Sequence, residues 1–213
     1  MDSLLPRERA EIAPGAVHLP GWLDVDDQRR LVSACREWAV PPAGMRATIM
    51  PSGGVMSVRT VCLGWHWIPY RYSRFADDGA PVKPFPDWLG DLGRRAVAED
   101  FPEIDYRPDV ALINFYDDAA KMGLHQDKDE RSPAPVVSFS LGDSCLFRFG
   151  NTENRNRPWT DVELQSGDLF VFGGESRSAF HGVTRMLPGT VPDDIGLPSG
   201  RLNITLRESG LDG

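Results

Sequence analysis

The residues best suited to chemistry in this sequence are His125 and Asp127, which are separated by a single residue. Because successive side chains of a β-strand point to opposite faces, residues i and i+2 point the same way. An imidazole nitrogen and a carboxylate oxygen on one face can bind the same metal ion. The pair is equally compatible with a surface histidine beside a solvated acid, because the acidic run continues through Asp129 and Glu130. A third ligand is needed to decide between the two interpretations.

His181 is the candidate for that third ligand. It follows Phe180 and precedes Gly182, after an apolar segment at 167–172 that is typical of a strand. Taken alone, a histidine beside a phenylalanine also fits a buried histidine of the core. Two histidines and one carboxylate form the facial triad of non-haem Fe(II) oxygenases, which leaves the other metal positions open. The three residues together predict an iron site with room for a bidentate cosubstrate and oxygen.

Polar and apolar residues alternate over 201–207 near the C-terminus. One face of this predicted strand carries leucine and isoleucine, and the other carries Arg201, Asn203, Thr205 and Arg207. The pattern fits a half-buried strand whose polar face meets water. It also fits a strand whose polar face lines a barrel interior, where buried arginines require anionic partners. A dicarboxylate ligand would supply them through charge-assisted hydrogen bonds.

A second strand with buried polar positions is predicted over 110–116. Asn114 and Tyr116 share one face of this otherwise apolar run. The tyrosine can simply satisfy a backbone carbonyl in the core. Both side chains can also donate hydrogen bonds to an oxoacid.

The elements that position these residues are mainly β. From Val110 onward, short alternating segments separated by Gly, Pro, Asn and Asp predict a sandwich or barrel. We expect a strand at 16–19 and extended, aromatic-rich chain over 44–75, which is a candidate lid. Residues 1–15 fit a loose arm, and 1–213 fit a single domain.

Two helices are expected outside the barrel. Asp24 can cap the first, which runs to about Ala39 and is ended by the prolines that follow. The second fits Asp87 to about Asp100. The predicted fold class is therefore α+β, mainly β.

Composition restricts the cellular setting. The chain of 213 residues has no apolar run long enough for a membrane span and no signal peptide, so we expect a cytoplasmic monomer. Cys35, Cys62 and Cys145 are too scattered for a disulfide framework or a zinc site. The net charge of −8 disfavours bulk binding of nucleic acid, although a local basic groove remains compatible with it.

The order of these motifs resembles the AlkB family of Fe(II)- and 2-oxoglutarate-dependent dioxygenases, the bacterial alkylated-DNA repair type in particular. The resemblance is dense over about 108–207. It is carried by Asn114-x-Tyr116, His125-x-Asp127, Ser138-x-Ser140-Leu141-Gly142, His181-Gly182 and Arg201-x-Asn203-x-Thr205-x-Arg207. It implies a double-stranded β-helix, or jelly-roll, core over about 108–209 and an N-terminal nucleotide-recognition lid.

The resemblance also implies the cofactors and their ligands. Iron would be held by His125, Asp127 and His181, and 2-oxoglutarate and O2 would be the cosubstrates. Arg207 would hold the distal carboxylate of 2-oxoglutarate. The remaining cosubstrate contacts would come from Asn114, Tyr116, Arg201, Asn203 and Thr205.

The implied substrate is alkylated DNA, single-stranded or with the damaged base flipped out, with RNA as an alternative. Trp65 would stack on the base and Asp129 would meet its exocyclic amine. Trp67 is assigned to the apolar cluster of the lid itself. Further substrate contacts are expected from Met56, Tyr70, Tyr72, Lys121, Gln126, Lys128, Glu130 and Arg155.

The implied reaction is oxidative demethylation of bases such as 1-methyladenine and 3-methylcytosine, with release of formaldehyde, succinate and CO2. Two alternatives fit the same motifs. The same core can act on RNA, a protein side chain or a small metabolite. A cupin-like barrel can bind a metal or ligand without catalysis.

Overall fold

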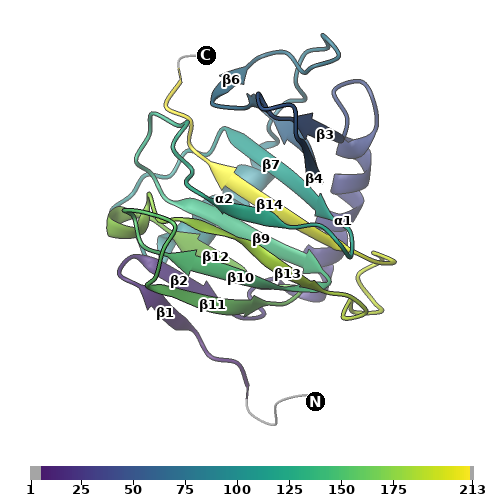
Figure 1. Ribbon diagram of the computed structural model, residues 1–213. Helices are drawn as coiled ribbons and strands as arrows, with labels where there is room; N and C mark the ends of the chain where they lie inside the picture. The colour runs from purple at the N-terminus through teal and green to yellow at the C-terminus, as the bar shows by residue number, and fades with distance from the viewer. Residues whose placement is uncertain (1–5, 212–213) are drawn as a thin grey trace.

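Two antiparallel β-sheets form the centre of the computed structural model, which describes residues 6–211 (Figure 1). The major sheet has the spatial order β1 (Ala10–Ala13), β2 (Ala16–Leu19), β12 (Leu169–Phe172), β9 (Val136–Gly142), β14 (Arg201–Arg207), β7 (Val110–Tyr116), β4 (Val55–Leu63) and β3 (Arg46–Ile49). The minor sheet has the order β11 (Trp159–Leu164), β10 (Ser144–Gly150), β13 (His181–Leu187) and β8 (Met122–His125). This is the predicted double-stranded β-helix.

Two helices cover the outer face of the major sheet, α1 (Val25–Ala39) and α2 (Asp87–Ala98). Asp24 caps α1 as expected, since its carboxylate accepts a hydrogen bond from the Asp27 amide at 2.8 Å. The helix α2 ends at Ala98, slightly short of the predicted boundary. Leucines on the inner faces of both helices pack on the apolar face of the major sheet, which forms one of the two main hydrophobic cores. Neither helix is long and apolar enough to span a membrane.

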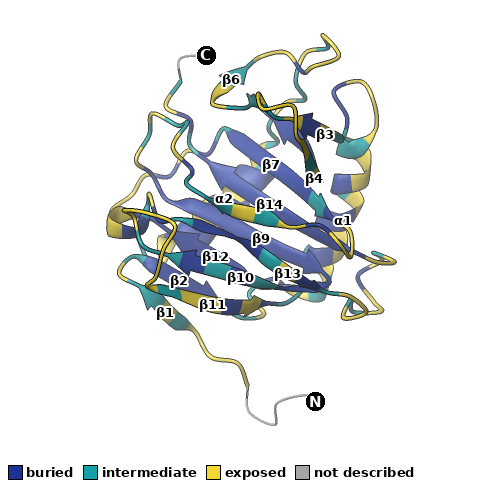
Figure 2. Cartoon of the chain, viewed as in Figure 1, coloured by how far each residue is buried: buried dark blue, intermediate teal, exposed yellow. Residues whose placement is uncertain are grey.

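The strand β14 is buried along its whole length, which decides between the two interpretations of its alternating pattern (Figure 2). Leu202, Ile204 and Leu206 belong to the core under the helices. Each such buried side chain contributes about 1.5–3 kcal/mol relative to exposure. The arginines at both ends of the strand therefore lie between the two sheets, not in water. A second core, which includes several phenylalanines, joins residues of both sheets, and the ring centroids of Phe147 and Phe170 lie 5.0 Å apart in an edge-on arrangement.

The segment expected to be a lid is partly built into the main sheet. Its strands β3 and β4 extend the major sheet beyond β7. Only the hairpin of β5 (His66–Ile68) and β6 (Arg71–Ser73) forms a separate small sheet. The expected loose arm includes β1, which pairs with β2, while residues 1–5 lie outside the described residues. Most of the segment over 44–75 is therefore held by sheet hydrogen bonds.

Candidate active site

His125, Asp127 and His181 converge at one end of the minor sheet. His125 ends β8 and His181 begins β13, and the two are direct cross-strand partners. One ligand atom from each of the three residues lies within 4.8 Å of the others. The Nδ1 atoms of the histidines lie 2.9 Å and 3.0 Å from the carbonyl oxygens of Gly123 and Ala179. These contacts leave both Nε2 atoms for a metal ion, because the partner of one ring nitrogen fixes the role of the other.

The electrostatics of the site favour the protonation states that bind metals. Burial lowers the pKa of His181 to about 4, although Asp127 opposes the shift. Burial alone would raise the pKa of Asp127, but the charges of Arg207 and the histidines lower it to about 2. Near neutral pH the site therefore offers a neutral imidazole and an ionised carboxylate, which are the forms that bind metal.

One oxygen of the Asp127 carboxylate is available to bind a metal ion. Its Oδ1 forms an ion pair with Arg207 Nη2 at 2.7 Å. Its Oδ2 is buried and has no hydrogen-bond partner within residues 6–211. A buried, charged acceptor without a partner is unfavourable unless a cation completes it. The donor set thus fits Fe(II), with Asp127 bound through a single oxygen.

A small cavity lies between the sheets beside the triad, and its walls match the cosubstrate residues expected from the sequence. All six of those residues line it: Asn114, Tyr116, Arg201, Asn203, Thr205 and Arg207. Three of them bond to one another, because Asn203 Oδ1 accepts from Thr205 Oγ1 at 3.0 Å and from Asn114 Nδ2 at 3.3 Å. Thr60, which the sequence did not single out, donates to Asn114 Oδ1 at 2.8 Å.

Arg201 is the residue in this cavity that most needs an anion. Its side chain is 1% exposed, and only its Nη2 has a partner, Ser140 Oγ at 3.0 Å. The Nε and Nη1 atoms have no partner among the described residues. Leaving such donors of a buried cation unpaired is costly. A carboxylate of the ligand would satisfy them.

The two arginines have different surroundings, which bears on the cosubstrate roles expected for them. Arg207 contacts the iron ligand Asp127 directly. The distal carboxylate of a metal-chelating 2-oxoglutarate must lie away from the metal. We therefore expect Arg201 to hold the distal carboxylate and Arg207 to lie beside the chelating end, in place of the distal role expected for Arg207 from the sequence. Spacing along a strand could not show this, because both ends of β14 carry an arginine on the same face.

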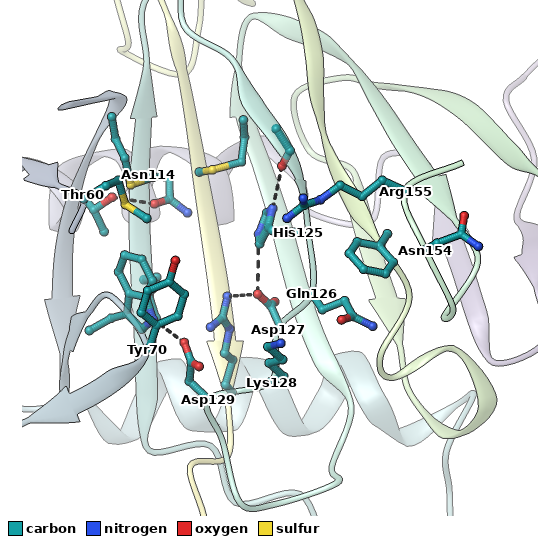
Figure 3. Close-up of a pocket in the computed structure, with 18 of the residues that line it drawn as sticks. Thr60, Tyr70, Asn114, His125, Gln126, Asp127, Lys128, Asp129, Asn154 and Arg155 are labelled. Carbon is teal, nitrogen blue, oxygen red and sulfur yellow. Dashed lines mark hydrogen bonds and ion pairs between the residues drawn. The ribbon is translucent and has the colours of Figure 1, made fainter. Parts of the chain in front are cut away.

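A larger cavity of about 750 Å³ is lined by His125 and Asp127 of the triad (Figure 3). Thr60, Asn114 and Tyr70 lie on one side of it, Arg155 and Asn154 on the other, with His125 and Asp127 between them. It is lined as expected by Met56, Tyr70, Gln126, Lys128, Asp129 and Arg155. It is also lined by residues that the sequence did not indicate, including Met50, Trp67, Met122, Asn154 and Phe180.

Trp67, not Trp65, is the tryptophan of this cavity. Trp65 is 9% exposed and packs in an apolar cluster. Its Nε1 donates to Asp109 at 3.1 Å and the Arg74 guanidinium covers its ring at 3.5 Å. The chain turns at Gly64, with a φ of +75°, so Trp65 lies outside the strand alternation that aims Trp67 at the cavity. Trp67 Nε1 donates to Asp129 Oδ2 at 2.8 Å.

Four other expected substrate contacts have different surroundings. The side chain of Glu130 is buried and forms ion pairs with two arginines, and Tyr72 donates to it; neither Glu130 nor Tyr72 lines the cavity. Lys121 is exposed and also outside the lining. Gln126 lines the cavity, but its amide donates to the carbonyls of Thr152 and Ser178 at 3.1 and 2.7 Å, so it anchors the loop over 151–157.

Comparison with known proteins agrees with this geometry. A family model described as the 2OG-Fe(II) oxygenase superfamily matches residues 15–207. The alpha-ketoglutarate-dependent dioxygenase AlkB of Escherichia coli K12 is 41% identical over 175 residues, covering 78% of this chain and 77% of the relative. The AlkB homolog of Caulobacter vibrioides is 39% identical over 207 residues, covering 93% and 89%.

Plant proteins are similar as well. The DNA N(6)-methyladenine demethylase ALKBH1D of Arabidopsis thaliana is 34% identical over 220 residues, covering 92% of this chain; the chain spans about half the length of that relative. The solved structure of OsALKBH1 matches with a TM-score of 0.84 and 35% identity, covering 93% of this chain and 100% of the other.

The jelly-roll core, the triad and the arginine-lined cavity define the class of Fe(II)- and 2-oxoglutarate-dependent dioxygenases. The chain belongs to the AlkB family within the 2OG-Fe(II) oxygenase superfamily. Its iron-binding residues are His125, Asp127 and His181, and its cosubstrates are 2-oxoglutarate and O2.

Proposed function

We propose that this protein is an oxidative demethylase of N-alkylated bases in nucleic acid, with methylated single-stranded DNA as its main substrate. The observation that carries the proposal is the 750 Å³ cavity, which is lined by His125 and Asp127 of the triad and has an aromatic and a carboxylate on one wall. A flat base can stack on Trp67 while its polar edge meets Asp129. The relatives named as DNA demethylase and as AlkB support the same assignment.

The reaction suits groups that hydrolysis cannot remove. With iron, 2-oxoglutarate and O2 bound, the methyl group is hydroxylated and lost as formaldehyde, while 2-oxoglutarate becomes succinate and CO2. The protein supplies ligands, orientation and electrostatics. Because a stacked base cannot reach the triad, the target must be single-stranded or flipped out of the duplex.

Release of formaldehyde from methylated oligonucleotides tests this proposal. The purified protein should release formaldehyde and succinate from a single strand containing 1-methyladenine or 3-methylcytosine when Fe(II), 2-oxoglutarate and air are present. The same sequence as RNA measures the preference between the two nucleic acids. Succinate without formaldehyde on any nucleic acid would point to a protein or metabolite substrate, and no succinate at all would point to a binding module.

Asp129 is expected to favour lesions that carry positive charge. Methylation at N1 of adenine or N3 of cytosine gives a cation with an exocyclic amine, whereas 3-methylthymine is neutral and presents carbonyls. At about 4 Å and an effective dielectric near 20, a unit charge pair is worth roughly 4 kcal/mol before desolvation. If about a quarter of that survives, the preference is about fivefold. Asp129→Asn removes the charge but keeps an oxygen for Trp67.

We expect Asp129→Asn to slow repair of 1-methyladenine and 3-methylcytosine by about fivefold and to change repair of 3-methylthymine much less. Single-turnover rates on the three lesions, in one oligonucleotide context, measure this. Glu103→Gln changes an exposed carboxylate that does not line the cavity and is the matched control. Equal slowing of all three lesions would show that Asp129 only supports the cavity wall.

Trp67 is expected to provide the stacking surface that the sequence assigned to Trp65. Stacking of a base on an aromatic ring is worth about 1–3 kcal/mol, so Trp67→Ala should weaken oligonucleotide binding by about 5- to 150-fold. Trp65→Phe should lower the melting temperature, because Trp65 is packed in the core, and leave oligonucleotide affinity near that of the wild type. Fluorescence anisotropy and thermal unfolding of both variants measure the two effects. Loss of affinity in Trp65→Phe alone would restore the original assignment.

A further inference from the structure

A buried carboxylate behind the iron site has no role in the chemistry described so far. The side chain of Glu130 is 0% exposed and receives hydrogen bonds from three donors. Arg207 Nη1 lies 2.9 Å from Oε1, and Arg177 Nη2 lies 3.0 Å from Oε2. The hydroxyl of Tyr72 also donates to Oε1. Removing any one of these partners would leave a buried charge uncompensated, which is costly. The Glu130 carboxylate is therefore held in one position.

Arg207 links Glu130 to the iron ligand Asp127. The guanidinium of Arg207 uses Nη1 for Glu130 and Nη2 for Asp127 Oδ1, at 2.9 and 2.7 Å. Arg177 supports the same arrangement from behind, since its Nη1 donates to the backbone oxygen of Asp127 at 2.6 Å and its Nε to that of Ala134 at 2.8 Å. The orientation of the Asp127 carboxylate is therefore set by a chain of charged groups that begins at Glu130.

The same carboxylate also reaches the wall of the substrate cavity. Tyr72 belongs to β6, and its cross-strand partner on β5 is Trp67. Trp67 in turn donates to Asp129, the neighbour of Glu130 in sequence. The β5–β6 hairpin is thus fastened to the segment over 127–130 at two points, one on the cavity side and one on the buried side.

We infer that Glu130 is a positioning residue for the iron site, which holds Arg207 against Asp127 and ties the β5–β6 hairpin to the same ion-pair network. Without its charge, Arg207 has one anionic partner fewer and is free to turn away from the carboxylate of Asp127. Asp127 could then bind the metal through both oxygens. The second oxygen would occupy a coordination position that the cosubstrate needs. The link to the metal stands independently of the substrate; the link through the hairpin rests on the proposed function.

Glu130→Gln tests the first link, because glutamine keeps the size and one acceptor oxygen but removes the charge. Binding of 2-oxoglutarate to the Mn(II)-loaded protein is measured by calorimetry without nucleic acid. The visible charge-transfer absorption of the Fe(II) and 2-oxoglutarate complex is recorded without oxygen. Groups that orient metal ligands typically change affinity or activity by about 10- to 100-fold when replaced, so 2-oxoglutarate affinity should fall by at least about tenfold and the absorption should shift.

Two variants make the result decisive. Arg177→Lys cannot contact both the backbone oxygen of Asp127 and the carboxylate of Glu130, so it should also weaken 2-oxoglutarate binding. This variant keeps the inference testable if Glu130→Gln does not fold. Glu103→Gln should change neither quantity, since it lies on the surface. Wild-type affinity and spectrum in a folded Glu130→Gln, or in Arg177→Lys if Glu130→Gln does not fold, would overturn the inference.

Tyr72→Phe tests the hairpin link and needs the methylated oligonucleotide. We expect the Tyr72→Phe variant to form more succinate per formaldehyde than the wild type, because the cavity wall is no longer fixed relative to the iron site. An unchanged ratio would refute the hairpin link. The 2-oxoglutarate measurements on Glu130→Gln stay valid if no nucleic acid proves to be a substrate, so failure of the proposed function and failure of this inference are distinguishable.

Discussion

Asp127→Ala is expected to abolish turnover. The variant removes the one anionic ligand of the triad and the partner of Arg207 Nη2. Replacing groups that merely orient metal ligands costs up to about 100-fold, so loss of the ligand itself should exceed that. Succinate and formaldehyde formation, with Fe(II) at saturating concentration, measure the effect.

Asp127→Asn is the matched variant, because it keeps the shape and an oxygen for Arg207 while removing the charge. It should be as inactive as alanine but unfold closer to the wild-type temperature, since Arg207 still has two partners. His125→Ala and His181→Ala should lose activity to a similar degree. Near-normal activity of Asp127→Ala would disprove the triad.

Arg201→Ala is expected to cause the largest loss of cosubstrate affinity among the cavity residues. A buried charge partner left unpaired costs roughly 2–5 kcal/mol, so the 2-oxoglutarate dissociation constant should rise by about 30- to several thousand-fold. Arg201→Lys should recover only part of this, because lysine lacks the planar set of donors. Calorimetry with Mn(II) in place of iron measures the binding without turnover.

The contrast with Arg207 separates the two arginine roles. In the structure, Arg207 already has Asp127 and Glu130 as partners, whereas within residues 6–211 the one hydrogen-bond partner of Arg201 is the hydroxyl of Ser140. We therefore expect Arg201→Ala to act on 2-oxoglutarate binding alone and Arg207→Ala to weaken metal binding as well. Arg185→Ala, on the exposed side of β13, is the control. An Arg201→Ala variant that binds 2-oxoglutarate normally would return the distal carboxylate to Arg207.

Patterns that depend on local spacing predicted most of the fold. The alternation over 110–116 and 201–207, the cap at Asp24 and the run of strands after Val110 all rest on interactions within a few residues. The boundaries of α1 agree with the prediction, and α2 ends slightly early. The partial merging of the lid with the major sheet was not predicted, because the pairing of β4 with β7 joins segments that are distant in sequence.

The sequence by itself determined the iron ligands as candidates and the six residues of the cosubstrate cavity. Residue type and strand periodicity made these residues candidates. The resemblance to the AlkB family assigned them their roles. The tertiary structure alone decided which arginine has no anionic partner among the described residues, which tryptophan faces the cavity and that the side chain of Glu130 is buried. These outcomes depend on partners more than forty residues away, such as Arg207 and Arg177 for Glu130. A side chain's ionic partners and exposure are properties of packing, and no local pattern encodes them.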